Sequence, residues 1–415
     1  MIGDRLKTEI LRYDNLGRGI AKVDNMIVFV NDSFIGEMVE IEIKQVKKNY
    51  MEATLVNIIK KSPYRRISPC KYSDSCGGCN LINLDFDKQV KEKQDKIKEM
   101  FTRNFSYSIT INKILSNDKE FNYRNKIVLH GDNKEIGLYR NKTNEIVPIN
   151  RCLLVSDIIN SMITLVNKIK DNEKINIDEI TIRCNKKGNV LVNILGKCNK
   201  KILKDTFLGI DTLVLNDNLL IGDGCYIEEE LFGYNFKVSA NSFFQVNLDM
   251  VEFLYKEVIR HIKDNNYNRV LDLYCGTGTL SLLVSRYANE VIGIETSISA
   301  VLDANENKKV NGVDNVEFIC GKVEDYIDKF EEVELIIVDP PRSGLDSKTI
   351  ENIIRIKPNN IVYVSCNPVT LIRDLKALDD EYVIKEVTTV DMFPNTYHVE
   401  CVILLSLKKC KNVVN

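Results

Sequence analysis

The sequence lacks the features of a membrane or secreted protein. No apolar run approaches the ~18 residues that span a bilayer, and the opening residues, MIGDRLKTEILRYD, contain no apolar signal-peptide core. The formal net charge is only −2, which argues against a surface coated in positive charge, so any nucleic-acid site has to be a local patch. We therefore expect a cytoplasmic protein with no membrane partner and, by default, a monomer.

Histidine is also scarce, and its three residues show no metal-ligand spacing. Cysteine is plentiful, but the cytoplasm is reducing, so the 12 cysteines are not expected to form disulfides. Four of them stand apart as Cys70-x5-Cys76-Gly-Gly-Cys79 followed by Cys152. Zinc ribbons prefer two C-x2-C pairs, whereas an iron-sulfur cluster tolerates three clustered thiolates and a distant fourth. The spacing favours iron-sulfur and leaves zinc as the alternative.

Residues 1–58 are predicted to form a small β-barrel. Short β-rich runs such as IAKVD, MIVFV and MVEIEIKQV are divided by turn signals, which is typical of a closed barrel of the oligonucleotide-binding kind. Residues 40–66 carry seven Lys and Arg against three Glu. Such barrels commonly hold nucleic acid, so this basic patch is a candidate RNA contact, with a solvated basic face as the alternative.

The rest of the chain divides into two further domains. Residues 59–235 combine an exposed helix near residues 87–105 with strand-like runs such as KIVLH and NVLVNIL, which predicts an α+β central domain. Residues 236–415 alternate apolar strands with helices. That alternation is the pattern of an α/β fold with a doubly wound, mostly parallel sheet.

A nucleotide pocket is predicted where the first strand of that sheet ends. The run VLDLYCGTG, residues 270–278, is a strand followed by a glycine turn, and Gly276 lets the backbone approach a ligand closely. Glu295 ends the next strand and is placed to accept hydrogen bonds from two ribose hydroxyls. The dinucleotide pattern G-x-G-x-x-G requires a third glycine where this chain has Ser281. The pocket therefore favours S-adenosylmethionine, which has no pyrophosphate, over a dinucleotide.

Several side chains are expected to converge on this pocket. Asp272, Glu295, Asp339 and Cys366 each fall at the end of a predicted strand, and such sheets bind ligands outside the carboxyl ends of their parallel strands. Glu400 begins the last strand. It reaches the same edge if the last two strands form an antiparallel hairpin.

A thiol beside a methyl-donor pocket indicates methylation at carbon. Carbon 5 of uracil is a weak nucleophile until a thiolate adds to carbon 6, and a carboxylate can then remove the surplus proton from carbon 5. Cys366, within SCNP, is the candidate nucleophile, and Glu400 is a candidate base. The competing interpretations are a buried core cysteine and a solvated carboxylate of a hairpin. The flanking Ser, Asn and Pro, together with the DPPR motif of the neighbouring strand, favour the nucleophile.

Together these motifs resemble the RNA uracil-C5 methyltransferase family, in its ribosomal RNA branch with an N-terminal TRAM domain and a 4Fe-4S cluster. The resemblance extends over nearly the whole chain. It implies a TRAM barrel in residues 1–58, an iron-sulfur loop and RNA-binding central domain in residues 59–235, and a class I, Rossmann-like methyltransferase domain in residues 236–415. It also implies cluster ligands at Cys70, Cys76, Cys79 and Cys152, donor contacts at Gln245, Tyr274, Glu295 and Asp339, the nucleophile at Cys366 and the base at Glu400.

The resemblance implies that the protein methylates carbon 5 of a uridine in 23S ribosomal RNA, because the transfer RNA branch usually lacks both barrel and cluster. Transfer RNA is the alternative substrate. An iron-sulfur oxidoreductase with a nicotinamide cofactor is a rival class, against which Ser281 counts. A non-catalytic RNA-binding factor of ribosome assembly is another, against which Cys366 and Glu400 count. If the target base is flipped out, Phe243 or Phe244 is expected to replace its lost stacking.

Overall fold

The computed structural model describes residues 2–132 and 135–408. The chain forms two compact units. The barrel unit comprises Met1–Asp95, Tyr139–Glu145 and Phe393–His398, and the sheet unit comprises Lys96–Leu138, Ile146–Met392 and Val399–Asn415. The division falls within helix α1 (Phe86–Asn104). No helix in the described part of the chain is long and apolar enough to cross a membrane.

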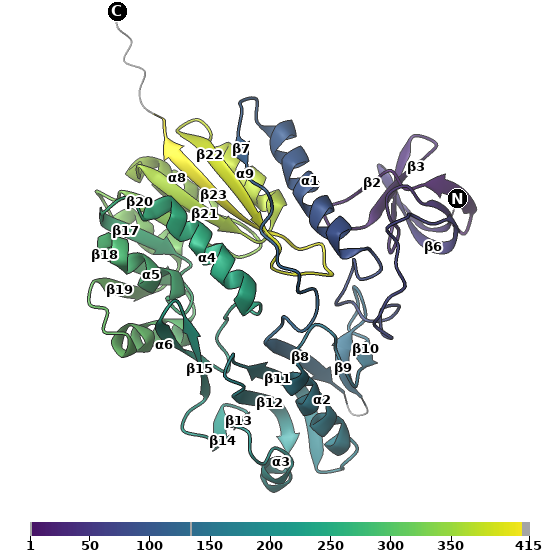
Figure 1. The fold of residues 1–415 in the computed structure, drawn as a ribbon, viewed down its shortest axis with the longest axis horizontal. Coiled ribbons are helices and arrows are strands. Elements are labelled where there is room, and N and C mark those ends of the chain that lie inside the picture. Colours follow the sequence, from purple (N-terminus) through teal and green to yellow (C-terminus); the bar gives the residue numbers. More distant parts are fainter. Residues whose placement is uncertain (1, 133–134, 409–415) are drawn as a thin grey trace, which may run out of the picture. The chain divides into compact units, whose positions relative to one another are not determined.

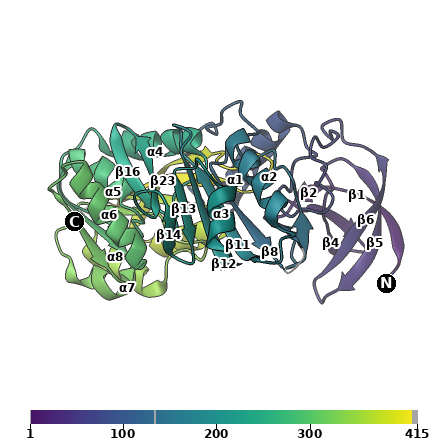
Figure 2. The same ribbon diagram turned by 90° about the horizontal axis from the view of Figure 1, so that it is seen from below.

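The barrel unit contains a six-stranded sheet in the order β1-β5-β6-β4-β3-β2. Its strands are β1 (Arg5–Glu9), β2 (Arg12–Tyr13), β3 (Gly19–Val23), β4 (Met26–Val30), β5 (Met38–Val46) and β6 (Tyr50–Lys60). β1 and β2 stand at opposite ends of this order, yet only Ile10 and Leu11 separate them in the chain. The Ile10 amide donates to the Glu37 carbonyl and the Leu11 amide to the Ile20 carbonyl. The sheet therefore closes on itself, which confirms the predicted small barrel (Figure 2).

Alternating apolar residues fill the inside of this barrel. In β5, Val39, Ile41 and Ile43 are buried, while the residues between them are partly or fully exposed, as the two-residue period of a strand requires. Val28 and Val30 of β4 belong to the same core.

A seven-stranded sheet forms the first part of the sheet unit, in the order β10-β9-β8-β11-β12-β13-β14. Its strands are β8 (Lys126–Gly131), β9 (Ile136–Tyr139), β10 (Ile146–Pro148), β11 (Ile175–Cys184), β12 (Val190–Cys198), β13 (Thr212–Leu215) and β14 (Asn218–Ile221). Helix α2 (Asp157–Ile169) packs against β11, and α3 (Lys200–Thr206) follows β12. A separate hairpin, β15 (Tyr226–Leu231) and β16 (Tyr234–Ser239), comes next. Helices with mostly antiparallel strands agree with the predicted α+β organisation.

An eight-stranded sheet forms the second part of the sheet unit, in the order β19-β18-β17-β20-β21-β23-β22-β7 (Figure 1). Its strands are β7 (Thr110–Ile111), β17 (Tyr267–Leu273), β18 (Ala288–Glu295), β19 (Val316–Cys320), β20 (Leu335–Val338), β21 (Asn360–Ser365), β22 (Tyr382–Val390) and β23 (Glu400–Leu407). The five strands from β19 to β21 pair in parallel, which confirms the predicted doubly wound sheet.

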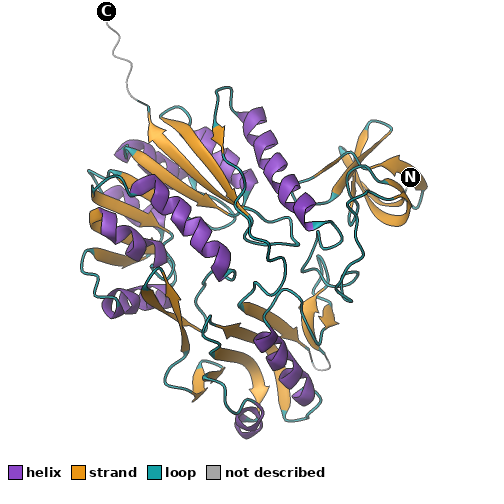
Figure 3. Cartoon of the chain, in the orientation of Figure 1, coloured by secondary structure: helices purple, strands orange, loops and turns teal. Residues whose placement is uncertain are grey.

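Helices alternate with these strands along the chain and flank the sheet (Figure 3). They are α4 (Leu248–Ile262), α5 (Thr279–Val284), α6 (Ile298–Val310), α7 (Val323–Tyr326), α8 (Ser347–Ile356) and α9 (Pro368–Leu378), with short 3-10 turns at Ser285–Tyr287 and Ile327–Lys329. Because the helices cover the sheet, its central strands can be apolar throughout. All four residues of β20 are buried.

The last two long strands form the predicted antiparallel hairpin, but β23 lies between β21 and β22. β23 runs antiparallel to both neighbours, so β22 runs in the direction of β21. The two-residue strand β7 pairs in parallel with β22 at the edge of the sheet. A strand of this length has no periodicity, and the sequence therefore did not predict it.

Candidate active site

The candidate residues of the sheet unit lie at the carboxyl ends of neighbouring strands. Asp339 and Cys366 directly follow β20 and β21, Asp272 is the second-last residue of β17, and Glu295 is the last residue of β18. From β17 the chain proceeds to β18 and β19 on one side, then returns to β20 on the other. The edge between β17 and β20 is therefore the topological switch point, where open α/β sheets bind their ligands.

The turn after β17 has an unusual backbone. Tyr274, Gly276 and Gly278 all have positive φ, at 65°, 55° and 77°, and such values are easy for glycine but strained for tyrosine. The Gly276 amide donates to Glu295 Oε2 at 3.1 Å, and the Ser297 amide donates to Oε1 at 2.8 Å. Glu295 is thereby fixed beside the glycine turn. The Thr296 hydroxyl also donates to Oε1, at 3.1 Å, and because a carboxylate has about four lone-pair sites, this side chain retains capacity for a ribose hydroxyl.

Asp272 carries a buried acceptor that the protein itself does not use. The residue is 1% exposed, and its Oδ2 accepts a hydrogen bond from the Ser281 hydroxyl at 2.6 Å. Its Oδ1 is buried and has no hydrogen-bond partner among the described residues. Burial raises the pKa of Asp272 to about 7, although the bond from Ser281 opposes this. An unmet acceptor at the ligand edge fits a donor group of a bound ligand, such as the ammonium of S-adenosylmethionine.

The hydrogen bond from Ser281 to Asp272 was not predicted from the sequence. The sequence analysis treated Ser281 only as the absence of a glycine, whereas the hydroxyl orients Asp272. The signal in the sequence was that Ser281 lies in the short helix, α5, that follows the strand carrying Asp272.

Cys366 and Glu400 come from adjacent antiparallel strands. The register pairs Ser365, the last residue of β21, with Cys401 of β23, and Cys366 and Glu400 are the next residues along the chain at this end of the pair. The two side chains are close enough to interact, because Glu400 is among the groups that raise the pKa of Cys366. Glu400 is 4% exposed, and Cys366 is half-buried. A thiol and a carboxyl group therefore lie close together at this sheet edge.

The surroundings of this pair disfavour the charged form of both groups. Burial raises the pKa of Glu400 well above its ordinary value, and the Asp339 carboxylate adds to the effect. Burial, together with Glu400 and Asp339, raises the pKa of Cys366 to about 11. Arg342 lowers both pKa values, and burial raises the pKa of Asp339 to about 6. A positively charged ligand at this edge would favour the thiolate.

Asn367 ties the loops after β20 and β21 together. Its Nδ2 donates to the Arg342 carbonyl at 2.8 Å, and its Oδ1 accepts from the Val369 amide at 3.2 Å, which caps α9. The Thr370 hydroxyl donates to the same Arg342 carbonyl at 3.2 Å. The DPPR and SCNP motifs are therefore one connected structure. The sequence analysis named both motifs, including Asn367, but not the hydrogen bond by which Asn367 joins them.

Gln245 lies in the loop between β16 and α4. The loop is held at one end by Arg183, whose Nη2 donates to the Ser242 carbonyl at 3.3 Å. At the other end, Asn247 Nδ2 donates to the Met392 carbonyl at 3.0 Å. The backbone that carries Gln245 is thus fixed to both sheets of the sheet unit.

The two phenylalanines of this loop differ in exposure. Phe243 is 70% exposed, whereas Phe244 is 4% exposed and packs against Phe236, with ring centroids 6.2 Å apart. The expectation that Phe244 can stack on a flipped base is therefore wrong, because its faces are buried in the core. Phe243 remains available.

The four candidate ligand cysteines are divided between the units. Cys70, Cys76 and Cys79 belong to the barrel unit and Cys152 to the sheet unit, and each is partly exposed. The Gly78 amide donates to Cys76 Sγ at 3.4 Å, a type of bond that tunes iron-sulfur ligands. Among residues 2–132 and 135–408, no three His, Cys, Asp or Glu side chains are grouped so as to hold a metal ion. Thiolates are the ligands that both iron-sulfur clusters and zinc prefer, so the four residues suit either metal chemically.

Fold and site define a class of protein. A donor pocket at the switch point of a class I methyltransferase sheet, with a half-buried thiol and a buried carboxyl group beside it, indicates an S-adenosylmethionine-dependent methyltransferase. Residues 184–408 match the family model described as tRNA (Uracil-5-)-methyltransferase, and residues 1–56 match that of the TRAM domain. The chain belongs to this methyltransferase family and is an S-adenosylmethionine-dependent RNA uracil-C5 methyltransferase.

Similar proteins match over nearly their whole lengths. An uncharacterized RNA methyltransferase of Caldanaerobacter subterraneus is 35% identical and covers 97% of this chain and 98% of its own. One from Clostridium acetobutylicum is 34% identical and covers 95% of each. The solved structure of Pyrococcus abyssi tRNA (uracil-54, C5)-methyltransferase with S-adenosyl-L-homocysteine has 29% identity and a TM-score of 0.78, and covers 96% of this chain and 99% of that one. These findings favour methyl transfer over the oxidoreductase and non-catalytic alternatives.

Proposed function

We propose that the enzyme methylates carbon 5 of a uridine in 23S ribosomal RNA, with Cys366 as nucleophile and Glu400 as base. The observation that carries this proposal is the position of the two side chains, at the end of β21 and the start of β23, where Glu400 acts on the pKa of Cys366 and Asp272 of the same sheet edge has a buried acceptor without a partner among the described residues. Methylation of carbon 5 requires both a nucleophile and a base. Methylation of a nitrogen atom requires no such thiol.

The proposed reaction proceeds through a covalent adduct. The Cys366 thiolate adds to carbon 6 of the uracil ring, and the electron pair of the carbon 5–carbon 6 double bond moves toward carbon 5. Carbon 5 then forms a bond to the methyl carbon of S-adenosylmethionine while the bond from that carbon to sulfur breaks, so the donor leaves as S-adenosylhomocysteine. Glu400 removes the proton from carbon 5, the double bond forms again, and the bond from carbon 6 to sulfur breaks. Cys366 leaves as a thiolate and Glu400 holds the proton.

The electrostatics support these roles once the substrates are bound. In the site without ligand, the raised pKa of Cys366 disfavours the thiolate. S-adenosylmethionine is a cation, and a positive charge near the buried carboxyls lowers the pKa values of its acidic neighbours. We therefore expect donor binding to increase thiolate formation. The order of events is then donor before sulfur attack.

We also propose the donor contacts. Glu295 is fixed beside Gly276 by its amide bond, which supports a ribose contact at this strand end. Tyr274 follows β17 with a positive φ, and Asp339 follows β20. Gln245 is carried on a loop whose two ends are anchored by hydrogen bonds. These contacts predict that donor affinity falls when Glu295 is changed to Gln, whereas Cys366→Ala leaves it intact.

A substituted RNA tests the covalent step. With 5-fluorouridine at the target position, carbon 5 has no proton for Glu400 to remove, so the adduct through Cys366 should persist. The expected result is a protein–RNA conjugate that survives denaturation and maps to Cys366 by peptide mass. Cys198→Ala, a half-buried cysteine of β12, is the matched control and should still form the conjugate. A conjugate that persists in Cys366→Ala would refute the assignment.

Transfer RNA is the second candidate substrate, and a specific observation favours it. The Pyrococcus abyssi enzyme acts on tRNA according to its name, yet it matches 96% of this chain. The presence of the barrel therefore does not by itself separate the two RNA classes. Reaction of the purified enzyme with 23S and tRNA transcripts and labelled donor distinguishes them, and mass mapping of cellular RNA identifies the uridine. Label in tRNA alone would replace the ribosomal proposal.

We further propose that Cys70, Cys76, Cys79 and Cys152 bind a 4Fe-4S cluster. Their spacing and the amide bond to Cys76 sulfur support it, although no metal ligands are grouped in the part of the chain that the structure describes. Anaerobic purification should give about four iron and four sulfide per chain, with the visible absorption of such clusters. One zinc per chain without sulfide would favour the zinc alternative. Neither metal enters the steps above.

Three expectations from the sequence stay predictions. They are the domain boundaries at residues 58 and 235, the location in the cytoplasm, and the monomeric state. Light scattering of the purified protein tests the last of these directly.

A further inference from the structure

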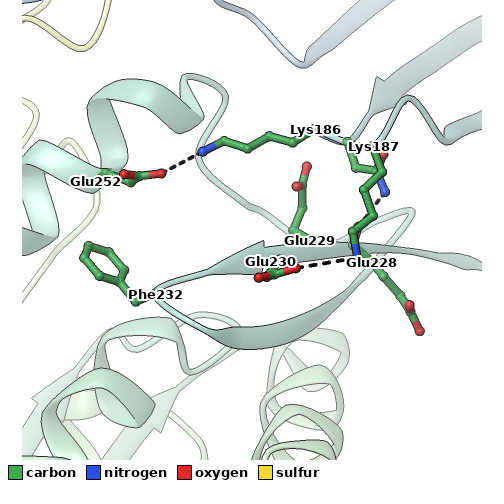
Figure 4. Close-up of a pocket in the computed structure, with 8 residues that line it drawn as sticks. Lys186, Lys187, Glu228, Glu229, Glu230, Phe232 and Glu252 are labelled. Carbon is green, nitrogen blue, oxygen red and sulfur yellow. Dashed lines mark hydrogen bonds and ion pairs between the residues drawn. The ribbon is translucent and has the colours of Figure 1, made fainter.

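The sheet unit contains a pocket that has no part in the proposed methyl transfer. It has a volume of about 290 Å³ and lies between the β11–β12 turn, the β15–β16 hairpin and helix α4 (Figure 4). Its lining residues are predominantly charged: Asn185, Lys186, Lys187, Glu228, Glu229, Glu230, Phe232 and Glu252.

Most of the charges at the rim compensate each other. Lys186 Nζ lies 2.7 Å from Glu252 Oε1, and Lys187 Nζ lies 3.6 Å from Glu230 Oε2. Both lysines and both of these glutamates are substantially exposed. Neither of these two ion pairs involves Glu229, which is the buried glutamate of the pocket.

Glu229 is built into the floor of the pocket. It is 2% exposed, although it lines the opening, and its Oε1 has no hydrogen-bond partner among the described residues. Figure 4 shows its carboxyl group rising from β15 toward Lys186. Burying an acceptor without a partner costs free energy, so this atom favours a ligand that brings a donor.

The groups facing Glu229 come from several elements. The Lys186 amide of the turn donates a hydrogen bond to its carboxyl group, while the Arg183 guanidinium of β11, the Lys186 ammonium and the Asn125 side chain, just before β8, also favour its charged form. Burial raises the pKa of Glu229 to about 7, against the opposing effects of these groups. Glu229 therefore changes its charge near neutral pH.

Phe232 supplies an apolar wall next to this carboxyl group. It occupies the tip of the hairpin with φ of 55°, followed by Gly233 with φ of 77°, where asparagine or glycine is the usual choice. A bulky side chain at such a φ is strained. Its ring already attracts one cation, since Lys256 Nζ lies 6.0 Å from the ring centroid.

We propose that this pocket binds a primary alkylammonium group of the kind that diamines and polyamines carry, with the ammonium on Glu229 and the methylene chain along Phe232. A directly coordinated metal ion fits less well, because no three acidic, His or Cys side chains are grouped for a metal among residues 2–132 and 135–408. An anion fits less well, because the Glu229 carboxyl group lies on the floor and both lysines of the rim are already paired with Glu252 and Glu230. The site goes beyond the methyltransferase function and does not depend on it.

Calorimetric titration of the full-length protein with 1,4-diaminobutane tests the proposal, with 1,4-butanediol as the uncharged molecule of the same length. We expect the diamine to bind and the diol not to bind. The ionised fraction of a carboxyl with pKa about 7 rises about tenfold from pH 6 to pH 8, so affinity should rise about tenfold over that range. Magnesium chloride at equal charge should not displace the diamine.

Two variants locate the site. Glu229→Gln should weaken diamine binding at least tenfold and abolish its pH dependence, whereas Glu317→Gln, at an exposed position of β19, should change neither. Phe232→Asn places a residue that suits the backbone at the hairpin tip, so the protein should stay folded while the affinity falls. Unchanged binding in both Glu229→Gln and Phe232→Asn, equal binding of the diol, or no binding of the diamine would overturn the proposal.

Discussion

Two buried glutamates of the sheet unit have similar exposure but opposite electrostatics. Glu257 on α4 is 8% exposed and Glu400 on β23 is 4% exposed. Burial raises the pKa of Glu257, but hydrogen bonds from Arg260, His261 and Thr388 outweigh it, so the pKa is lowered overall. Glu400 accepts no hydrogen bond from the part of the chain that the structure describes, and burial raises its pKa well above the ordinary value.

The difference separates a structural carboxylate from one available for chemistry. Arg260 Nη2 lies 2.6 Å from Glu257 Oε1, and the Thr388 hydroxyl lies 2.5 Å from the same atom, so Glu257 fastens α4 to β22. For Glu400, the Asp339 carboxylate adds to the effect of burial and Arg342 opposes it, and a buried carboxyl group with a strongly raised pKa is typical of a residue that takes part in proton transfer. Asp272 and Asp339 also have raised pKa values, and they lie at the same sheet edge.

The largest effect is expected when the nucleophile is removed. Cys366→Ala should reduce product formation by at least about 10⁴-fold, because no other group can activate carbon 5. Donor binding, measured by calorimetry, should stay within about twofold, since the sulfur takes no part in it. Substantial methylation by this variant would show that carbon 5 reacts without the thiol.

The next largest effect is expected at Glu400. Glu400→Gln should still transfer the methyl group in the first turnover but slow release of product by at least about 100-fold, so protein-linked RNA accumulates. Denaturing gel electrophoresis of the reaction detects this species, and Glu257→Gln is the matched control that should not accumulate it. If Glu400→Gln releases methylated RNA at the normal rate, another group is the base.

The sequence predicted the strand ends of this site but not the contacts between them. Apolar runs before Asp272, Glu295 and Asp339 are local features, so their positions at strand ends could be read directly. Cys366 comes near Glu400 because the end of β21 pairs with the start of β23. These two strands are separated in the chain by α9 and β22, and the periodicity of a sequence does not show which strands pair.

The hydrogen bond of Asn367 and the pocket at Glu229 could not be predicted, because both arise only from tertiary packing. Asn367 reads as part of a motif, and only the folded chain brings its amide to the Arg342 carbonyl. Glu229 reads as one of three consecutive glutamates, which suggests an exposed charge run. Of the three glutamates, the alternation of β15 buries only Glu229, and its carboxyl group lies on the floor of the pocket.

The charge of Asp339 provides a smaller test. In the enzyme without ligand, alkylation of Cys366 by iodoacetamide should accelerate as pH rises toward the thiol pKa of about 11. Asp339→Asn removes a negative charge that raises this pKa, so the alkylation profile should move to lower pH. Asp314→Asn, at an exposed position, should leave the profile in place. A shift to higher pH would contradict the assigned sign.

The smallest effects concern stability and complete the comparison of the two glutamates. Glu257→Gln should destabilise the fold by about 2 kcal/mol at pH 7, because it breaks a buried, charge-assisted network. A lowered folded-state pKa stabilises the protein above the ordinary carboxyl pKa of about 4.3, and this contribution is lost as pH falls through the folded-state value. The difference from wild type should therefore hold near pH 7 and shrink in acid, as urea denaturation can measure.

Glu400→Gln should behave in the opposite way in the same denaturation experiment. A raised folded-state pKa stabilises the protonated form, so the cost of the native Glu400 appears as pH rises above the ordinary carboxyl pKa. Glutamine resembles the protonated group, and the variant should match or exceed the wild type in stability at pH 8. The exposed pair of Arg269 and Glu290, 2.6 Å apart, gives the reference, since Glu290→Gln should change stability by less than about 1 kcal/mol. A large loss at Glu400 would mean that its carboxylate holds the fold, as that of Glu257 does.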